Sequence, residues 1–408
     1  MAGDPVTGRP AAPEGAAPLR LLAVASHPVQ YHAPWFRALA IRPELELCVL
    51  FAERPDATQQ GRGFGVAFTW DVPVLEGYAW RDAPVRLRGK PWPAFLARSI
   101  ARPAQLLREL RPDAVLLTGW HVWPLVQMLI AARRAGIPVV MRGEANALRT
   151  RPRHVRALHR WLLGQCAAFL PIGKASRAFY KGYGVADARL FDAPYFVDNA
   201  HFAGQAAQCE PQRAELRARW AVPADAVCFC YAGKLEPKKR ILDLLQALKF
   251  AAPTSPRRLH LLVVGTGELM AQAQAFAAEH NLPVTFAGFL NQSEIPGAYV
   301  AADALVLPSD FGETWGLVVN EAMACGRAVV VSDRVGCAAD LVVPGDTGTV
   351  FPFGDTAGLA RALVDMAQDP ARLRAMGERA RAHVMRNYTV ERSTQATVQA
   401  VRQVACST

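Results

Sequence analysis

Two glutamates eight positions apart, Glu313 and Glu321, are the residues of this sequence whose type and spacing point most directly to chemistry. A short apolar run before them ends in the turn-like segment 308–312, so we expect a buried strand followed by a helix that begins near Thr314 or Trp315. The free amides and positive dipole end of that helix would hold a phosphate. At about 1.5 Å per helical residue the two carboxylates stand roughly 12 Å apart, which suits a ligand with hydroxyls at both ends and phosphates between them. The alternative is that Glu313 only stabilises the helix dipole and Glu321 is solvated.

The pattern continues on both sides of this pair. In chain order it comprises Pro308-Ser309, Gly316-Leu317, Glu321-Ala-Met-Ala, Gly326 and Ala328-Val-Val-Val-Ser332-Asp333. This run resembles the carboxyl-domain signature of retaining GT-B glycosyltransferases of the family 4 type (glycosyl transferases group 1), in which seven residues separate two glutamates. The resemblance implies an α/β fold with two doubly wound, Rossmann-like domains that face a central cleft.

The same resemblance implies an activity and a set of site residues. The expected enzyme is a retaining, hexosyl-type glycosyltransferase that uses a UDP-sugar or GDP-sugar and needs no metal or other cofactor. Glu313 would position the sugar as a catalytic residue and Glu321 would bind the ribose, with Gly312, Gly316 and Leu317 as further donor-binding residues. Metal-dependent transferases usually hold the diphosphate through an Asp-x-Asp, and no two aspartates of this sequence lie two positions apart.

Two lysines follow the first strand expected in the second domain, one in Gly233-Lys234-Leu235 and the other at Lys239. In the resembling enzymes a Gly-Arg-Leu followed by a Lys supplies two cations to the donor diphosphate, so we expect this catalytic role for Lys234 and Lys239. Lysine in place of arginine is a departure, because an ammonium group is a point charge without a bidentate fork. The alternative is a solvated basic turn.

Two further strand ends complete the expected donor site. Gly265 follows the apolar run 260–264, and Gly288-Phe289-Leu290 follows the run 284–286. The resemblance implies that the nucleotide base rests against backbone and ring at Gly288, Phe289 and Leu290. By itself the Gly-x-Gly at 265–267 is weak evidence for dinucleotide binding.

Polar residues also follow three strands expected in the first domain, where they would line the cleft. These residues are His27, Gln30 and His32 after the run 20–25, His121 after 114–117, and Arg142 and Glu144 after 137–141. By resemblance His121 is a donor-side catalytic residue, and the other five are candidates for the acceptor side. The alternatives are histidines that cap turns or pack beside Trp35, and an internal Arg–Glu pair. Many of the resembling enzymes carry a Gly-Gly in the first loop, and this chain does not.

The length of 408 residues is sufficient for two domains of ordinary size. We place an acceptor-side domain at 19–205 and a nucleotide-sugar-binding domain at 215–385, because the polar, Ala-rich stretch 203–224 suits a boundary. Residues 1–18 are expected to form a disordered tail. The resemblance implies that a terminal helix at 388–406 crosses back to the first domain.

The net charge of +11 favours anionic partners. We expect a nucleoside-diphosphate sugar and a sugar acceptor, lipid-linked or part of a polysaccharide. Basic residues among aromatic residues in segments 81–102 and 149–161 either contact an anionic membrane surface or are solvated. Eight scattered cysteines and an apolar stretch broken by polar residues at 114–132 favour a cytoplasmic protein, free or peripheral at the inner face of the membrane.

Two other functional classes are compatible with these features. A nucleotide-sugar epimerase or a phosphorylase would use the same two-domain scaffold, but a transferase releases free nucleoside diphosphate only when an acceptor is present. A nucleic-acid-binding protein would use the basic charge. We expect no nucleic acid, because the arginines fall among expected helices without the aromatic-rich strands of an RNA-binding platform.

Overall fold

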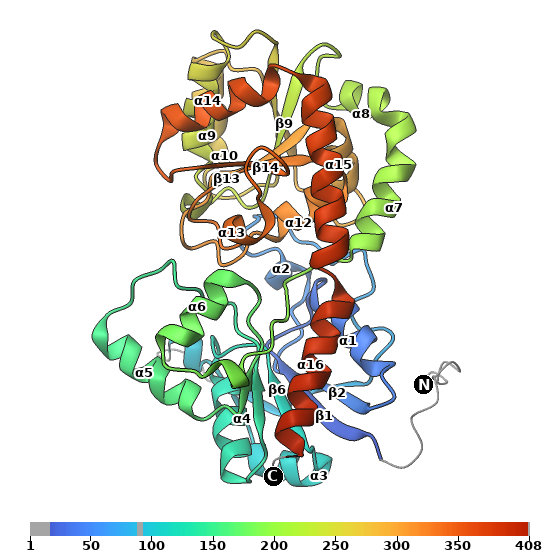
Figure 1. Ribbon diagram of the computed structural model, residues 1–408, viewed down its shortest axis with the longest axis vertical. Coiled ribbons are helices and arrows are strands. Elements are labelled where there is room, and N and C mark those ends of the chain that lie inside the picture. The colour runs from blue at the N-terminus through green and yellow to red at the C-terminus, as the bar shows by residue number, and fades with distance from the viewer. Residues whose placement is uncertain (1–16, 88–92, 407–408) are drawn as a thin grey trace.

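A computed structural model of the chain describes residues 17–87 and 93–406, which form two α/β domains stacked along the long axis (Figure 1). Most of the tail expected at 1–18 lies outside the described residues. So do Arg88, Lys90 and Trp92 of the first basic segment.

The first domain is built on a parallel six-stranded sheet. Its strands, in spatial order, are β3 (Trp80–Asp82), β2 (Leu45–Phe51), β1 (Leu19–Ala25), β6 (Ala114–Leu117), β7 (Val139–Met141) and β8 (Ala168–Phe169). Its helices are α1 (His32–Ala40), α2 (Ala57–Gln60), α3 (Pro103–Leu110), α4 (Trp123–Arg134), α5 (Arg153–Gly164) and α6 (Lys174–Gly182). A small antiparallel pair, β4 (Val85–Leu87) and β5 (Arg98–Ile100), lies outside the main sheet.

The second domain repeats this arrangement. Its strands, in spatial order, are β11 (Val284–Gly288), β10 (Leu259–Val264), β9 (Val227–Ala232), β12 (Ala304–Leu307), β13 (Ala328–Ser332) and β14 (Gly348–Phe351). Its helices are α7 (Asn199–Cys209), α8 (Arg213–Arg219), α9 (Ile241–Ala251), α10 (Met270–Glu279), α11 (Ile295–Ala301), α12 (Leu317–Ala324), α13 (Ala338–Leu341), α14 (Thr356–Ala367) and α15 (Pro370–Asn387).

Both sheets have the doubly wound strand order 3-2-1-4-5-6, counted within each domain. The central strands are continuous apolar runs because helices cover them on both sides, and every residue of β6, β9, β10 and β12 is buried. Each domain accordingly has two hydrophobic clusters, one on each side of its sheet. The predicted fold class is confirmed.

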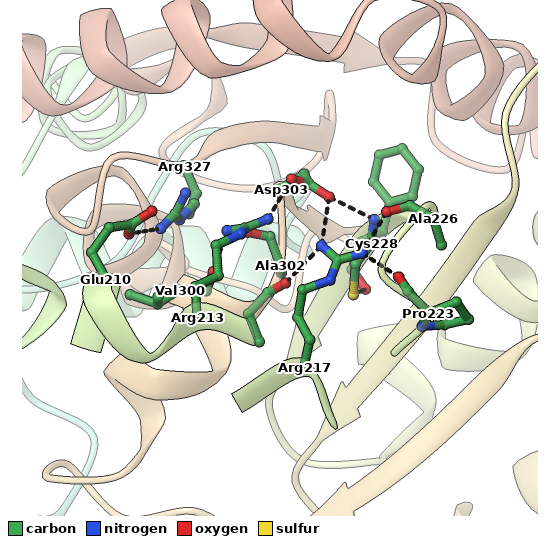
Figure 2. A network of polar contacts seen from close by, with 12 residues as sticks. Glu210, Arg213, Arg217, Pro223, Ala226, Cys228, Val300, Ala302, Asp303 and Arg327 are labelled. Carbon is green, nitrogen blue, oxygen red and sulfur yellow. Dashed lines mark hydrogen bonds and ion pairs between the residues drawn. The ribbon is translucent and has the colours of Figure 1, made fainter. Parts of the chain in front are cut away.

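The chain joins the second domain earlier than residue 205. Helices α7 and α8 pack on α11, and Phe202 and Ala206 belong to a core cluster of the second domain. A polar network fixes α8 there, as Figure 2 shows: Arg213 and Arg217 both bond the carboxylate of Asp303, which also accepts a hydrogen bond from the backbone N–H of Cys228. The structure therefore moves the boundary to about residue 198.

The last helix, α16 (Val390–Ala405), leaves the second domain and packs on α1 of the first (Figure 1). Its buried residues Ala400, Val401 and Val404 belong to a first-domain core cluster. The side-chain amide of Asn199 donates hydrogen bonds to the carbonyls of Val384 and Tyr388. The two places where the chain crosses between the domains therefore lie side by side.

Helix α12 starts later than its sequence indicates. We expected its first residue near Thr314 or Trp315, but the helix begins at Leu317. Gly316 precedes it with φ +99°, a left-handed conformation that a helix cannot include. A Cβ at Gly316 would also lie 2.9 Å from side-chain atoms of Leu307 and Val335.

Among the described residues, no helix has both the length and the apolar character needed to span a bilayer.

Candidate functional site

A cavity of about 920 Å³ lies between the two domains. Its walls come from segments that follow β1, β2, β6 and β7 in the first domain and β9 and β12 in the second. These segments leave the carboxyl ends of parallel strands, which is where ligands bind in doubly wound sheets. Eight of the predicted site residues line it: His27, Gln30, His32, His121, Glu144, Lys234, Lys239 and Leu317.

Three histidines gather on the first-domain wall. Burial lowers the pKa of His27, His32 and His121, and the nearby Arg142 guanidinium lowers the pKa of His32 further. Nδ1 of His27 lies 3.0 Å from the hydroxyl of Ser26. At neutral pH these rings are therefore neutral hydrogen-bonding groups, and the cations of the cleft are lysines and arginines.

Glu144 occupies the junction between the domains. Its carboxylate accepts hydrogen bonds from the hydroxyl of Tyr195 at 2.5 Å and from the hydroxyl of Thr314, in the second domain, at 3.1 Å. The amide of Asn146 donates to the backbone carbonyl of Thr314 at 3.1 Å. A carboxylate held in this way at the cavity wall can accept a hydrogen bond from a hydroxyl of a ligand.

Arg142 is only 1% exposed, and its guanidinium lies 4.8 Å from the ring centroid of Trp35 and 4.6 Å from that of Tyr195. Its Nε and Nη2 atoms have no hydrogen-bond partner among the described residues. In place of the Arg–Glu pair considered as an alternative, the Arg142 guanidinium lies over the ring of Tyr195, whose hydroxyl donates to Glu144. Arg142 is not one of the described residues that line the cavity, so its predicted acceptor contact stays a prediction.

Lys234 and Lys239 line the opposite wall, on the loop after β9. Lys239 forms an ion pair with Glu313, and both side chains are 13% exposed. The ammonium group of Lys234 lies 4.8 Å from the ring centroid of Phe64, a first-domain residue, and burial lowers its pKa. Two cations thus face the cavity next to the start of α12, where Leu317 and Val318 line it.

Glu321 is 1% exposed and lies inside α12, not in solvent. Its Oε1 accepts a hydrogen bond from the hydroxyl of Tyr31 at 2.9 Å, and its Oε2 accepts one from Tyr299 at 2.6 Å. Burial raises the pKa of the carboxyl, and the two tyrosine donors oppose that shift. The solvated alternative is therefore excluded.

The predicted glycines of the donor site have clear backbone roles. A Cβ at Gly265, where φ is +120°, would lie 2.0 Å from the carbonyl oxygen of Gly233, so this glycine lets the loops after β9 and β10 touch. Gly265 also donates its N–H to the carbonyl of Gly288 at 2.7 Å. The N–H of Gly312 donates to the carboxylate of Asp310 at 2.6 Å and closes a turn. None of the three is among the described residues that line the cavity.

Phe289 contacts the first domain. Residues 61–73 of that domain, called the strap here, cross to the second domain, and the ring centroids of Phe68 and Phe64 lie 4.3 and 5.1 Å from that of Phe289. The side chain of Asn291 donates to the carbonyl of Thr69 at 2.8 Å. Leu290 packs against a core cluster of the second domain. A base bound at 288–290 would therefore lie next to the strap.

Several residues that shape the site were not singled out from the sequence. They are Tyr31, Gln60, Phe64, Trp70, Trp120, Tyr195 and Thr314, all in the cavity wall. Tyr31 lies between Gln30 and His32, which were predicted for the acceptor side. For the strap, the available sequence signal was the presence of three aromatic residues in a polar, glycine-rich segment. The described residues contain no group of three or more His, Cys, Asp or Glu side chains arranged to hold a metal ion.

Comparison with known proteins finds similarity to glycosyltransferases. Residues 212–383 match the family model described as Glycosyl transferases group 1. The chain is 34% identical over 184 residues to a D-inositol 3-phosphate glycosyltransferase of Streptomyces bingchenggensis (strain BCW-1), a match that covers 43% of this chain and 40% of that protein. It is 28% identical over 293 residues to a 2-deoxystreptamine glucosyltransferase of Streptomyces kanamyceticus, covering 68% of this chain and 74% of that one.

A solved structure with a similar fold is that of Anabaena Alr3699/HepE in complex with UDP and glucose. Its TM-score is 0.70 at 16% sequence identity, with 94% of this chain and all of that chain covered. At this identity the likeness concerns the fold. The matched part of the chain spans less than half the length of the inositol phosphate transferase named above.

Proposed function

From the match of the second domain to the glycosyl transferases group 1, we propose that the chain transfers a sugar from a nucleoside-diphosphate sugar to an acceptor held against the first domain. One observation carries the proposal. Lys234, Lys239 and the amino end of α12 converge on a single cavity between the carboxyl ends of two doubly wound sheets. That arrangement offers positive charge to a diphosphate and leaves the opposite wall for an acceptor.

In the proposed reaction the bond between the anomeric carbon and the diphosphate breaks while the acceptor oxygen bonds to that carbon, with retention of configuration, and the proton of the acceptor hydroxyl passes to the departing diphosphate oxygen. Negative charge then grows on the leaving diphosphate. Lys234, Lys239 and the free amides of α12 stabilise it, a role that a divalent metal has in other transferases. Glu313 is held beside Lys239 and orients the sugar, and His121 lies on the facing wall. Closure of the two domains excludes water and limits hydrolysis of the donor.

We propose an acceptor that carries both hydroxyl groups and a phosphate. Trp70 and Trp120 add aromatic rings to the cavity wall, and Arg149 and Arg151 add positive charge there, a combination that suits a phosphorylated sugar or cyclitol. Two relatives are named for cyclitol acceptors, D-inositol 3-phosphate and 2-deoxystreptamine. The phosphate would come from a soluble ring phosphate or from a lipid-linked intermediate. Assays with each class, measured as release of nucleoside diphosphate, separate the two sources.

A lipid-linked acceptor would require contact with a membrane surface, and helix α5 offers one. Leu158 and Trp161 are 53% and 49% exposed on a helix that also bears exposed Arg153, Arg156 and Arg160. Apolar side chains among arginines suit an anionic interface. Sedimentation with phosphatidylglycerol vesicles, compared with phosphatidylcholine vesicles, tests this surface. Trp161→Ala should weaken binding, whereas Phe250→Ala, which removes a ring 48% exposed on the second domain, should not.

The decisive experiment measures donor binding and turnover in paired variants. Glu321→Ala should weaken binding of UDP or GDP and of their sugar conjugates, while Glu313→Ala should lower turnover more than affinity. Unchanged kinetics in both would refute the site. Nuclear magnetic resonance of the first product formed reports retention, and activity in excess chelator reports metal independence. A product that is an intact nucleotide sugar with one inverted stereocentre would instead identify an epimerase.

A further inference from the structure

The buried carboxylate of Glu321 accepts hydrogen bonds from two tyrosine hydroxyls, one from each domain. Glu321 Oε2 is bonded by Tyr299, a fully buried residue of α11 in the same domain. Glu321 Oε1 is bonded at 2.9 Å by Tyr31, which comes from the first domain and inserts against a core cluster of the second. Tyr31 lies on the cavity wall and immediately precedes α1.

The role proposed above for Glu321 conflicts with this contact. A ribose offers its two hydroxyls as donors to a carboxylate. Each oxygen of Glu321 could accept a second hydrogen bond, but the side chain is 1% exposed and a tyrosine hydroxyl contacts each oxygen, so a ribose reaches the carboxylate only if one tyrosine moves. Tyr299 is fixed in the core of its own domain, whereas Tyr31 belongs to the other domain and lies on the cavity wall, so Tyr31 is the tyrosine that moves.

We propose that the hydroxyl of Tyr31 and a ribose hydroxyl compete for Glu321 and that donor binding expels Tyr31. This inference rests on the proposed function, because it requires Glu321 to bind the ribose. The hydroxyl of Tyr31 gives Glu321 Oε1 a donor that this buried oxygen would otherwise lack, and an unsatisfied buried oxygen is costly. Tyr31 is thus a positioning residue. Its hydroxyl lowers the affinity for the donor, keeps Glu321 hydrogen-bonded and joins the two domains at the site.

The displacement has a consequence for the acceptor. Tyr31 lies between Gln30 and His32 in the loop 26–32, which also carries His27. When Tyr31 leaves Glu321, this loop loses its hydrogen bond to the second domain. Donor binding should therefore alter the acceptor wall.

The test compares Tyr31→Phe with the wild type in titration calorimetry with UDP and with GDP. The variant keeps the ring and loses the competing hydroxyl, so affinity for the nucleotide that the wild type binds should rise on the order of tenfold, with a lower KM for the donor sugar. Lys174→Ala is the matched control. It removes a contact between the domains, from the Lys174 ammonium group to the carbonyl of Ala339, away from Glu321, and should leave affinity unchanged.

A second measurement needs no variant. Hydrogen exchange in residues 26–32 of the wild type should change when UDP or GDP binds. An affinity in Tyr31→Phe equal to or below that of the wild type, an equal gain in Lys174→Ala, or unchanged exchange in the loop would each overturn the inference. Failure of the proposed function gives a different result, in which the wild type binds neither UDP nor GDP.

Discussion

The carboxylate of Asp71, in the first domain, accepts hydrogen bonds from both the backbone N–H and the hydroxyl of Ser293, in the second domain. It also accepts the N–H of Gln292 at 3.1 Å. The strap that carries Asp71 thus caps free backbone donors just ahead of α11 in the other domain. Separation of the domains would expose the carboxylate and these N–H groups to water.

We expect Asp71→Ala to shift the protein toward a more open arrangement. The loss of a capping carboxylate costs about 1 kcal/mol, enough to change a balance between two arrangements severalfold. Small-angle X-ray scattering should show a larger radius of gyration. Asp355→Ala provides the control, because Asp355 caps α14 within the second domain and should lower thermal stability without changing the scattering. Identical scattering from Asp71→Ala and the wild type would contradict a role for the strap in closure.

The ion pair between Lys239 and Glu313 should contribute to stability as well as to catalysis. Lys239→Met leaves a buried carboxylate without its cation, so we expect a loss of roughly 3 kcal/mol in the free energy of unfolding. The double variant Lys239→Met, Glu313→Gln should recover most of this stability but none of the turnover. Chemical denaturation and a nucleoside-diphosphate release assay measure the two effects. Equal losses of stability in the single and double variants would show that the pair is not coupled.

Gly265 should be intolerant of substitution for reasons of backbone geometry. A Cβ there would overlap the carbonyl oxygen of Gly233 at a φ of +120°, so Gly265→Ala must move the loop that carries Lys234. We expect a loss of more than about 2 kcal/mol of stability together with weaker nucleotide binding. Gly164→Ala, whose added Cβ meets no atom within 4 Å, should be near neutral in thermal unfolding.

Two buried groups should make stability depend on pH in opposite directions. Burial lowers the pKa of His260 to about 4, so the folded state resists protonation and stability falls as pH drops from 6.5 toward 4. Burial raises the pKa of Asp340 to about 6, so the folded state keeps its proton and stability rises as pH drops through 6 toward 3.8. His260→Gln should therefore reduce the loss of Tm between pH 7 and pH 5, and Asp340→Asn should increase it. Parallel Tm curves for all three proteins would contradict both assignments.

The sequence predicts the sheets well because local composition determines them. The runs that became β2, β9, β10, β12 and β13 are largely apolar, and a strand covered by helices on both faces requires that composition. The start of α12 was misplaced by two or three residues, because Thr314 and Trp315 are compatible with a helix and only the left-handed conformation of Gly316, packed near Leu307, excludes them.

The composition of the individual strands and helices did not predict the contacts between the two domains. Spacing places Glu321 on a helix, but the tyrosine that bonds it comes from a position 290 residues earlier. The sequence predicts that Phe289 contacts the nucleotide base, but it does not predict the contact between Phe289 and Phe68 of the strap. Both features depend on how two independently folded sheets face each other, and hydrophobic periodicity carries no information about that.

The return of α16 to the first domain makes the second domain an insertion within the first. The chain enters it near Asp198 and leaves it near Tyr388, and Asn199 ties the exit to the entrance. Because the two connections between the domains are adjacent, they act as a single hinge. The domains can rotate about that hinge but cannot reorient independently. Under the proposed function, an exchange of donor specificity requires the transplant of residues 199–388 as one segment, because a single cut would leave the last helix of the first domain on the wrong fragment.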